Sequence, residues 1–480
     1  MSGCVARRSW PWVVGGCLLI LGVTLLHGDR VLHAQRANPA IRRAALDEIR
    51  KNIDREWITR AAIDGLMRYW VRHSVEPNGF IQENLDRQWK PWGTQREASI
   101  NGQGRQLYAM AVAYEMAPSA EFKDALTRGL DFMLKMRDPE FGGYYDRVGP
   151  NHEIINDEKT GFSSFVIFSL AEAGRVTGEQ KYLDEALAFF REMRDKMRDG
   201  PFIGSGRYTR DFMHRVPGGM FGLARPGAAG GPGSQAAPTN PAAQQARSAF
   251  ANRRHGINLH VFEALLSLYN ATGSEEVWYE IEQELKAIER LYDYEIGYLP
   301  ESYDENWKPV GNPSGNPGHL FEWASLLSRA VELGADPKFV ELGSRSLDLG
   351  LKSYNEAVGG LGGVTPDGRP ARMLWWPQCE VIKATANYAI LHGRSELWRY
   401  YHRTLDFVKR EYFDTEYGGW FQDYVPGQPR AERGEKAFYK GSVDGPEWGA
   451  YHQMSMFHDI WRITDPNYRP GPAVKPAARR

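Results

Sequence analysis

The sequence predicts an all-α fold, an (α/α)6 toroid or barrel of six helical hairpins. Three observations support this prediction. Glycine-centred turns recur about every sixty residues, two helix-like segments lie between successive turns, and six such units are the number that closes a ring of this kind. An open helical solenoid with the same period is the alternative.

The turns define the period. Glycines with aromatic or apolar neighbours recur at steps of 63, 62, 93, 63 and 58 residues, at Gly79, Gly142, Gly204, Gly297, Gly360 and Gly418. The one long step contains a tract rich in Gly, Ala and Pro, which we interpret as a low-complexity insert at residues 217–252. Without this insert the steps are nearly equal. Each turn is therefore expected to be a short hairpin at one mouth of the barrel.

The segments between the turns have helical periodicity. Apolar residues recur at three- and four-residue steps, for example over residues 161–173 and 181–197. The segment after each turn is the more apolar of the pair and should face inward, whereas its partner carries the charged runs of an outer helix. We expect the barrel to span residues 41–464, with a disordered tail at 465–480.

The N-terminus resembles an export signal. Arg7 and Arg8 precede a fourteen-residue apolar run at 13–26, and residues 32–34 resemble a small-residue cleavage site. The run is shorter than the roughly 20 residues that span a bilayer. We therefore interpret residues 1–34 as a signal peptide and expect a periplasmic or secreted protein with no membrane contact after cleavage. The arginine pair also allows twin-arginine export.

Composition narrows the class of partner. Lys plus Arg number 59 against 60 Asp plus Glu, so the basic excess typical of nucleic-acid binding is lacking. The 15 Trp, 23 Tyr and 21 Phe suit a sugar pocket or a large core. Cys379 is the one cysteine left after signal cleavage, so no intrachain disulfide is expected. We expect a small-molecule partner and a monomer or homodimer.

Polar residues on the inner helices are informative, because helices buried on most sides should be apolar. Each predicted inner helix carries at least one such residue, with a second polar or aromatic residue three or four positions away, which places both on one face. A closed ring would aim these faces at a common centre. The pairs are Arg105 with Tyr108, Lys159 with Phe162, His260 with Glu263, His319 with Glu322, Trp376 with Glu380, and Trp448 with His452.

Proton transfer is the chemistry that fits these residues. Of two histidines across a bound molecule, one can act as a neutral base and the other as a protonated acid. Glu263 and Glu322 could fix the ring tautomers, and Arg105 suits the oxygen that gains charge when a proton α to a carbonyl is removed. Trp376, Trp420 and Trp448 could stack on a sugar ring. Each residue also has a plain structural interpretation, as a core aromatic or a satisfied buried polar group.

Motifs for other chemistries are absent from the sequence. It has no HExxH, no cysteine pair and no tight Asp/Glu/His cluster of the kind that binds metals. A nucleophile elbow, a phosphate-binding P-loop and a dinucleotide fingerprint are missing as well. We therefore expect no metal and no cofactor.

The residues singled out also fall in ordered motifs. With these motifs the sequence resembles the N-acylglucosamine 2-epimerase family, and within it the cellobiose 2-epimerases, over roughly residues 41–464. The motifs are Gln103-Gly104-Arg105 with Leu107-Tyr108, residues 157–165, residues 258–264, Gly318-His319-Leu320-Phe321-Glu322, Trp375-Trp376-Pro377-Gln378-Cys379-Glu380, and Gly418-Gly419-Trp420-Phe421 with Tyr451-His452.

The resemblance implies an activity. It implies an (α/α)6 barrel that epimerises a sugar at C2, or converts an aldose to a ketose, through a cis-enediolate and without a metal. It implies that His319 and His452 form the acid/base pair and that His260 and Arg105 hold the ring-opened carbonyl. Further substrate-binding or supporting residues are expected to be Glu263, Glu322, Trp376, Glu380 and Trp420.

The chain departs from the family pattern in places, and other functions stay open. Residues 453–456 replace an arginine that is common after the C-terminal histidine, and Asn258 stands where a second histidine is common. One alternative is an (α/α)6 glycoside hydrolase or lyase with two carboxylates across a groove, from among Glu263, Glu322 and Glu380. The other is a glycan-binding protein without catalysis.

Overall fold

The computed structural model describes residues 47–49, 51–93, 96–216, 255–256, 258–304, 306–310, 316–362, 371–441 and 449–473. The expected signal peptide at 1–34 and the insert at 217–252 lie outside these residues. Within the described part of the chain, no helix is both long and apolar enough to cross a membrane.

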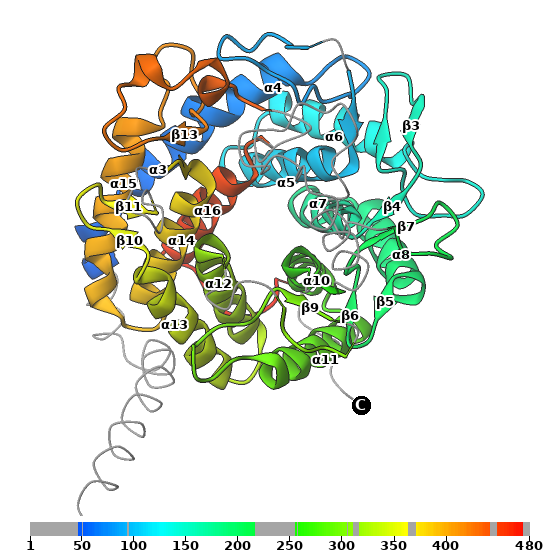
Figure 1. Cartoon of the computed structure of the whole chain (residues 1–480). Coiled ribbons are helices and arrows are strands. Elements are labelled where there is room, and N and C mark those ends of the chain that lie inside the picture. Colours follow the sequence, from blue (N-terminus) through cyan, green and yellow to red (C-terminus); the bar gives the residue numbers. More distant parts are fainter. Residues whose placement is uncertain are drawn as a thin grey trace, which may run out of the picture.

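The core of the molecule is a closed ring of helices. Each inner helix packs against the next, and the last packs against the first (Figure 1). This closure confirms the predicted (α/α)6 toroid and contradicts an open solenoid. Within the described residues the ring consists of six helices, α5 (Ile100–Met116), α7 (Ser164–Thr177), α10 (Leu259–Thr272), α12 (Pro317–Leu333), α14 (Trp375–Leu391) and α16 (Tyr451–Ile463).

An outer layer of helices covers this ring. The outer helices are amphipathic: α11, for example, buries Val277, Ile281 and Ile288 against the ring and carries charged residues on its other face. Five of the outer elements follow their inner helices in the chain, namely α6 (Ala120–Leu134), α8 (Gln180–Lys196), α11 (Glu275–Leu291), α13 (Lys338–Leu351) and α15 (Trp398–Glu411).

The sixth outer position is filled from the other end of the chain. It consists of α3 (Arg55–Ala62), the π-helical turn η1 (Ile63–Met67) and α4 (Arg68–Ser74). The α3 helix packs against α16, and in Figure 1 these two segments, coloured blue and red, belong to the same side of the ring. The last inner helix therefore gains its cover from the first helices of the chain.

The predicted glycine turns are hairpins. Short antiparallel pairs bracket them, for example the bridge between Val75 and Ile81 around Gly79. Gly79 has φ +89°, and a Cβ there would lie 2.0 Å from the Arg128 carbonyl oxygen. In the fifth hairpin Gly359, rather than the predicted Gly360, has the positive φ. In two of the hairpins the antiparallel pairing is long enough to form short strands. These are β5 (Arg198–Asp199) with β6 (Phe202–Ile203), and β10 (Tyr354–Asn355) with β11 (Gly360–Leu361).

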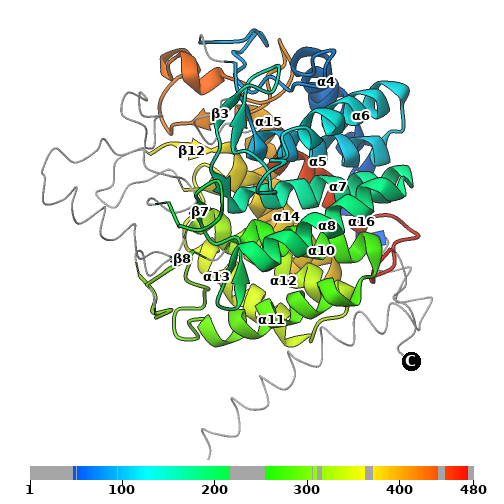
Figure 2. The ribbon, with the colours of Figure 1, turned by 90° about the vertical axis from the view of Figure 1, so that its right-hand side faces the viewer.

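A second set of strands joins neighbouring repeats at one mouth of the barrel. Residues just before an inner helix pair with a segment of the next repeat, and the bridge from Leu85 to Gly441 repeats this pattern across the ring closure. Figure 2 shows β3, β7, β8 and β12 toward the same end of the barrel. The pairs are β1 (Ala98–Ser99) with β2 (Arg147–Val148), which also pairs with β3 (Ile154–Asn156), β4 (Lys159–Thr160) with β7 (Arg207–Tyr208), β8 (His255–Gly256) with β9 (Ser302–Tyr303), and β12 (Met373–Leu374) with β13 (Asp423–Tyr424).

Side-chain caps fix where several inner helices begin. The Ser99 hydroxyl accepts a hydrogen bond from the Gly102 amide, and the Asn258 side chain accepts one from the His260 amide. The Asn316 side chain caps α12 in the same way, with proline at the first helical position. These caps decide which residues occupy the first turns at the mouth.

The C-terminal segment differs from the expected disordered tail at 465–480. Residues 465–473 are described and lie against the far end of the barrel. The Tyr468 hydroxyl donates to Glu332, and the Ala473 amide donates to the Asn270 carbonyl oxygen at 3.1 Å. These bonds attach residues 465–473, a polar segment without helical periodicity, to α12 and α10. Residues 474–480 lie outside the described part.

One buried carboxyl group is expected to make stability depend on pH. Glu284 of α11 is 1% exposed and its Oε1 has no hydrogen-bond partner among the described residues. Burial, with repulsion from Glu280, raises its pKa well above the ordinary 4.5. Above pH 4.5 the unfolded chain releases the Glu284 proton, whereas the folded protein keeps it. The free energy of unfolding therefore falls as pH rises above 4.5.

We therefore expect Glu284→Gln to raise the free energy of unfolding by about 1–3 kcal/mol at pH 8 and by much less at pH 4. Urea unfolding at both pH values measures this effect. Glu295→Gln, at an exposed position, is the control. A change of equal size at both pH values would contradict the explanation.

Candidate active site

The candidate residues come together at the mouth where the inner helices begin. His260, Trp376 and His452 are the second residues of α10, α14 and α16, and His319 is the third residue of α12. Arg105 lies in the second turn of α5. Because these helices share a direction, their first peptide N–H groups and the positive ends of their dipoles also converge there.

Arg105 joins two of the predicted histidines. Its side chain is buried, Nη2 lies 3.0 Å from His260 Nε2, and Nη1 lies 3.3 Å from His452 Nε2. A guanidinium group can only donate hydrogen bonds. Both Nε2 atoms therefore act as acceptors, and the neutral form of each ring carries its proton on Nδ1.

Neighbouring side chains fix the position of Arg105. Its Nε donates to Asn101 Oδ1 at 2.9 Å, and its guanidinium carbon lies 4.4 Å and 4.5 Å from the ring centroids of Phe165 and Tyr451. Contacts of this kind favour a buried cation. The arginine is thus held in one place at the centre of the site.

Two imidazoles flank one indole ring. His319 and His452 both lie 5.3 Å from Trp376, measured between ring centroids. The Nδ1 atom of His319 is 2.9 Å from Glu301 Oε1, and that of His452 is 2.9 Å from Glu380 Oε1. In each ring a carboxylate engages Nδ1, which leaves Nε2 as the nitrogen that can meet a substrate.

The pKa values of the two imidazoles are shifted in opposite directions. Burial lowers the pKa of His452 to about 4, even though Glu380 opposes this shift. Burial also acts on His319, but the Glu301 carboxylate outweighs it and raises the pKa of His319 above 6.5. His452 therefore favours the neutral form, which suits a base, and the protonated form of an acid is more accessible to His319.

His260 lies beside two carboxyl groups. Its Nδ1 is 3.3 Å from Glu263 Oε2, which also accepts a short hydrogen bond from Tyr451. Glu322 Oε1 is 3.9 Å from the same Nδ1, and neither Glu322 oxygen has a hydrogen-bond partner among the described residues. Burial raises the pKa of Glu263 to about 7 and that of Glu322 to about 8. Burial, with Arg105 next, lowers the pKa of His260 well below 6.5, so this ring is neutral.

Two sets of carboxyl and imidazole side chains converge in the folded chain, although no tight cluster is visible in the sequence. Each set has side-chain N and O atoms within 4.8 Å of one another: His260 with Glu263 and Glu322, and Glu322 with Glu380 and His452. Each set joins residues of at least two helices, so sequence spacing alone did not reveal it. The Nζ atom of Lys383 lies 2.6 Å from Glu380 Oε2, so the chain itself supplies a cation beside the second set.

Trp420 does not lie with the other candidates. Its indole is 3% exposed and packs 4.9 Å from Phe413 and 6.1 Å from Phe457, between ring centroids. Trp57 of α3 stacks on Phe413 in the same aromatic group. The residue expected to form a sugar platform is therefore part of the hydrophobic layer between α16 and the outer helices.

Two other residues of the predicted pairs, Lys159 and Tyr108, do not join the histidines at the centre of the site. Lys159 makes a buried ion pair with Asp138 at 2.9 Å, in the strands before α7. Tyr108 stacks on Phe168, one turn farther from the mouth than Arg105. Trp448 lies outside the described residues.

Sequence reasoning gave no role to three residues of the site. Lys383 follows Glu380 by three residues and was hidden in an apolar helix, and Tyr451 precedes a predicted histidine. Both could have been found as buried polar groups on the inner face. Glu301 comes from the segment before α12, where helical periodicity gives no signal.

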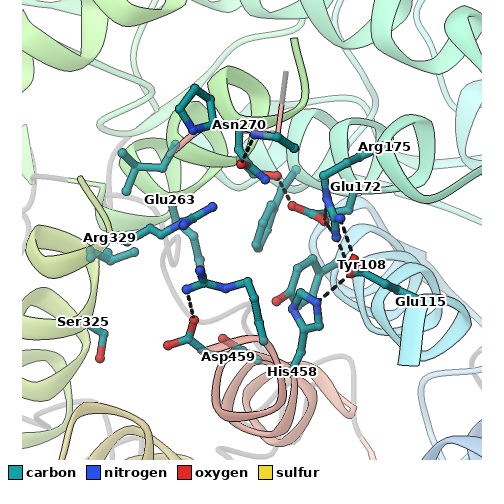
Figure 3. Close-up of a pocket in the computed structure, with 18 of the residues that line it drawn as sticks. Tyr108, Glu115, Glu172, Arg175, Glu263, Asn270, Ser325, Arg329, His458 and Asp459 are labelled. Atoms are coloured by element: carbon teal, nitrogen blue, oxygen red, sulfur yellow. Dashed lines mark hydrogen bonds and ion pairs between the residues drawn. The ribbon is translucent and has the colours of Figure 1, made fainter. Parts of the chain in front are cut away.

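The far end of the barrel axis holds a separate cavity of about 270 Å³ (Figure 3). Its charged side chains pair with one another. Arg175 bonds Glu115 and Glu172, and His458 Nε2 lies 2.8 Å from Glu115. Glu263 and Lys383 line this cavity too, so they form the floor between it and the candidate site.

Comparisons with known proteins identify relatives of this chain. The model of the family described as N-acylglucosamine 2-epimerase (GlcNAc 2-epimerase) matches residues 79–205 and 235–453. A cellobiose 2-epimerase of Bacteroides fragilis is 22% identical over 78% of this chain and 91% of its own length. A mannose-6-phosphate isomerase of Rhizobium meliloti is 31% identical, but the match covers only 30% of this chain and 40% of that protein.

Solved structures support the fold. The cellobiose 2-epimerase of Spirochaeta thermophila superposes with a TM-score of 0.69 at 20% identity, over 87% of this chain and 98% of that one. A GH76 α-mannanase of Bacteroides thetaiotaomicron is more distant, with a TM-score of 0.53 at 12% identity over 86% and 96% of the two chains.

We expect Glu301→Gln to lower the pKa of His319 by about one unit or more, because it removes the carboxylate that raises this pKa. NMR titration of protein with labelled histidine measures it, with the His319 signal assigned by its loss in His319→Gln. Glu295→Gln, exposed and in the same loop region, should leave the titration unchanged. An unchanged His319 pKa in Glu301→Gln would refute the assignment.

Proposed function

The chain belongs to the N-acylglucosamine 2-epimerase family, a family of carbohydrate epimerases and isomerases, and on this premise we propose its reaction. The protein acts on a ring-opened mono- or disaccharide as a 2-epimerase or an aldose–ketose isomerase. It does so by proton transfer to and from histidines, through a cis-enediolate.

One observation carries the proposal: two imidazoles whose pKa values are shifted in opposite directions lie beside Trp376, and a buried arginine contacts one of them. The distances are 5.3 Å from each imidazole to the indole and 3.3 Å from Arg105 Nη1 to His452 Nε2. A base, an acid and a donor for a developing oxyanion are the parts that proton abstraction next to a carbonyl requires.

The first step follows from these contacts. In the free protein an N–H group of Arg105 donates to His452 Nε2. When a substrate carbonyl oxygen accepts this hydrogen bond instead, the lone pair on His452 Nε2 becomes free. The neutral His452 then removes the proton from C2. The C–H bonding electrons form a C1=C2 double bond, and the carbonyl electron pair moves to O1, where Arg105 and the helix N-termini stabilise the negative charge.

The second step decides the product. The His319 imidazolium can return a proton to C2 from the opposite side, which gives the epimer. If the proton returns to C1 while the O2 hydroxyl proton moves to O1, the product is the ketose. Both outcomes need the same base and the same carbonyl contact, so the arrangement of residues supports both equally.

The contacts of the carboxyl groups do not support the hydrolase alternative. A glycosidase needs two carboxyl groups about 5–10 Å apart that face the scissile bond. Glu322 and Glu380 are at most 1% exposed, and Glu380 is engaged by His452 and Lys383. The non-catalytic alternative is distinguished by experiment, because a binding protein would hold a sugar without exchanging the proton at C2.

The first test is proton exchange at C2. Purified protein is incubated in heavy water with glucose, mannose, N-acetylglucosamine and cellobiose, and NMR follows deuterium at C2 and new anomeric signals. We expect deuterium incorporation together with an epimer or ketose of one of these sugars. If the sugars stay unlabelled while cello-oligomers are cut, the hydrolase alternative is correct.

The second test removes the base. We expect His452→Gln to lower kcat/KM by about 10²–10⁴-fold while sugar binding persists, because only the proton acceptor is lost. His402→Gln, exposed on α15, is the matched control. In the wild type, kcat/KM should fall below about pH 4, as His452 is protonated, and again on the alkaline side above 6.5, as His319 loses its proton. Full activity of His452→Gln would exclude this mechanism.

We also propose that the reaction takes place outside the cytoplasm, in the periplasm or the medium. The apolar run at 13–26 and the cleavage-like residues 32–34 support this. In the native host we expect the exported protein to start near residue 35, which N-terminal sequencing after fractionation measures. An uncleaved N-terminus in the cytoplasmic fraction would contradict it.

A further inference from the structure

A lysine with no role in the steps above lies directly beneath the histidines. Lys383 of α14 is 4% exposed, its Nζ is 2.6 Å from Glu380 Oε2, and it donates to Ser455 Oγ of α16 at 3.2 Å. A buried ammonium group is costly unless anions or hydrogen bonds compensate for lost hydration. The neighbours of Lys383 must therefore compensate its buried charge.

Three buried carboxyl groups from three helices act on this ammonium group. Glu263, Glu322 and Glu380 are all at most 7% exposed. Although burial opposes it, Glu380, Glu322 and Glu263 each raise the pKa of Lys383, which favours the charged form. Glu380 makes the direct contact, at 2.6 Å.

The ammonium group connects to the proposed base through one carboxylate. Lys383 pairs with one oxygen of Glu380, and the other oxygen accepts a hydrogen bond from His452 Nδ1 at 2.9 Å. Without a cation beside it, a fully buried Glu380 would favour its protonated form. A protonated Glu380 could donate to Nδ1 as well as accept from it, so it would no longer select the Nδ1–H tautomer of His452.

We propose that Lys383 is a positioning residue whose fixed positive charge keeps Glu380 ionised and thereby holds His452 in the neutral Nδ1–H form. In this way the chain supplies a permanent cation beneath the base. The link to turnover rests on the proposed function, whereas the effect on His452 itself does not.

Other charged groups face the same pair and stay unchanged in the test. Arg105 lies on the α5 side, His260 and Glu263 on α10, and His319 and Glu322 on α12. Tyr451 is the neighbour of His452 on α16. A shift that follows removal of the Lys383 charge alone can thus be assigned to that charge.

The test compares Lys383→Met, which keeps most of the volume and removes the charge, with Lys383→Arg, which keeps the charge. Ser455→Ala is the matched control, because it removes the neutral partner of Lys383 and leaves every charge in place. If Lys383→Met does not fold, Lys383→Gln removes the charge but retains a hydrogen-bonding group.

The first readout is NMR titration and tautomer analysis of labelled His452, which needs no substrate. We expect the Glu380–His452 pair to take up its proton about one pH unit or more higher in Lys383→Met, and little shift in Lys383→Arg or Ser455→Ala. An unchanged titration and tautomer in a folded Lys383→Met protein would overturn the proposal.

The second readout is the pH profile of kcat/KM. The acid limb should move up by the same amount as the NMR titration in Lys383→Met. If the wild type transforms no sugar but the His452 titration shifts, the positioning role stands and the proposed function fails. If the wild type is active and its acid limb does not move in Lys383→Met, the lysine has only a structural role.

Discussion

The parallel alignment of the inner helices is the constraint on which the rest of the structure depends. Ring closure makes α5, α7, α10, α12, α14 and α16 begin at the same mouth, so residues far apart in sequence share one centre. His260 and His452 are 192 positions apart in the chain, yet both bond the same guanidinium group. No single segment contains the site, and it exists only because the ring closes.

Charge compensation follows from this convergence. The helix N-termini favour anions at the mouth, and the chain places carboxylates, imidazoles, an arginine and a lysine within a few ångströms of one another. Their pKa shifts then have different directions because each group has different neighbours: Glu301 raises the pKa of His319, whereas burial lowers that of His452. Two residues of one type thus acquire opposite pKa shifts by location alone.

Much of this arrangement could be predicted from the sequence, because it is repeated. The glycine period predicted the hairpins, and polar residues in apolar helices predicted Arg105 and the three histidines. Features that depend on contacts between distant segments could not be predicted. Trp420 stands in a family motif, but α3 and α16 enclose it in an aromatic cluster, and no local pattern shows which outer helix covers it. Glu301 was missed because a loop residue acquires its role only when α12 places His319 beside it.

The packing of α3 against α16 also determines when the site can form during synthesis. The first outer helix emerges from the ribosome early, but its partner α16, with His452 in its first turn, is among the last segments made. Until then α3 keeps an apolar face without its cover, and the base is missing from the ring. The earlier hairpins can assemble on the growing chain, but the ring closes only after α16 has been made and can pack on α3 and α5. A nascent chain without α16 therefore lacks the base and leaves α3 and α5 without one of their packing partners, so its exposed apolar surface favours aggregation over partial activity.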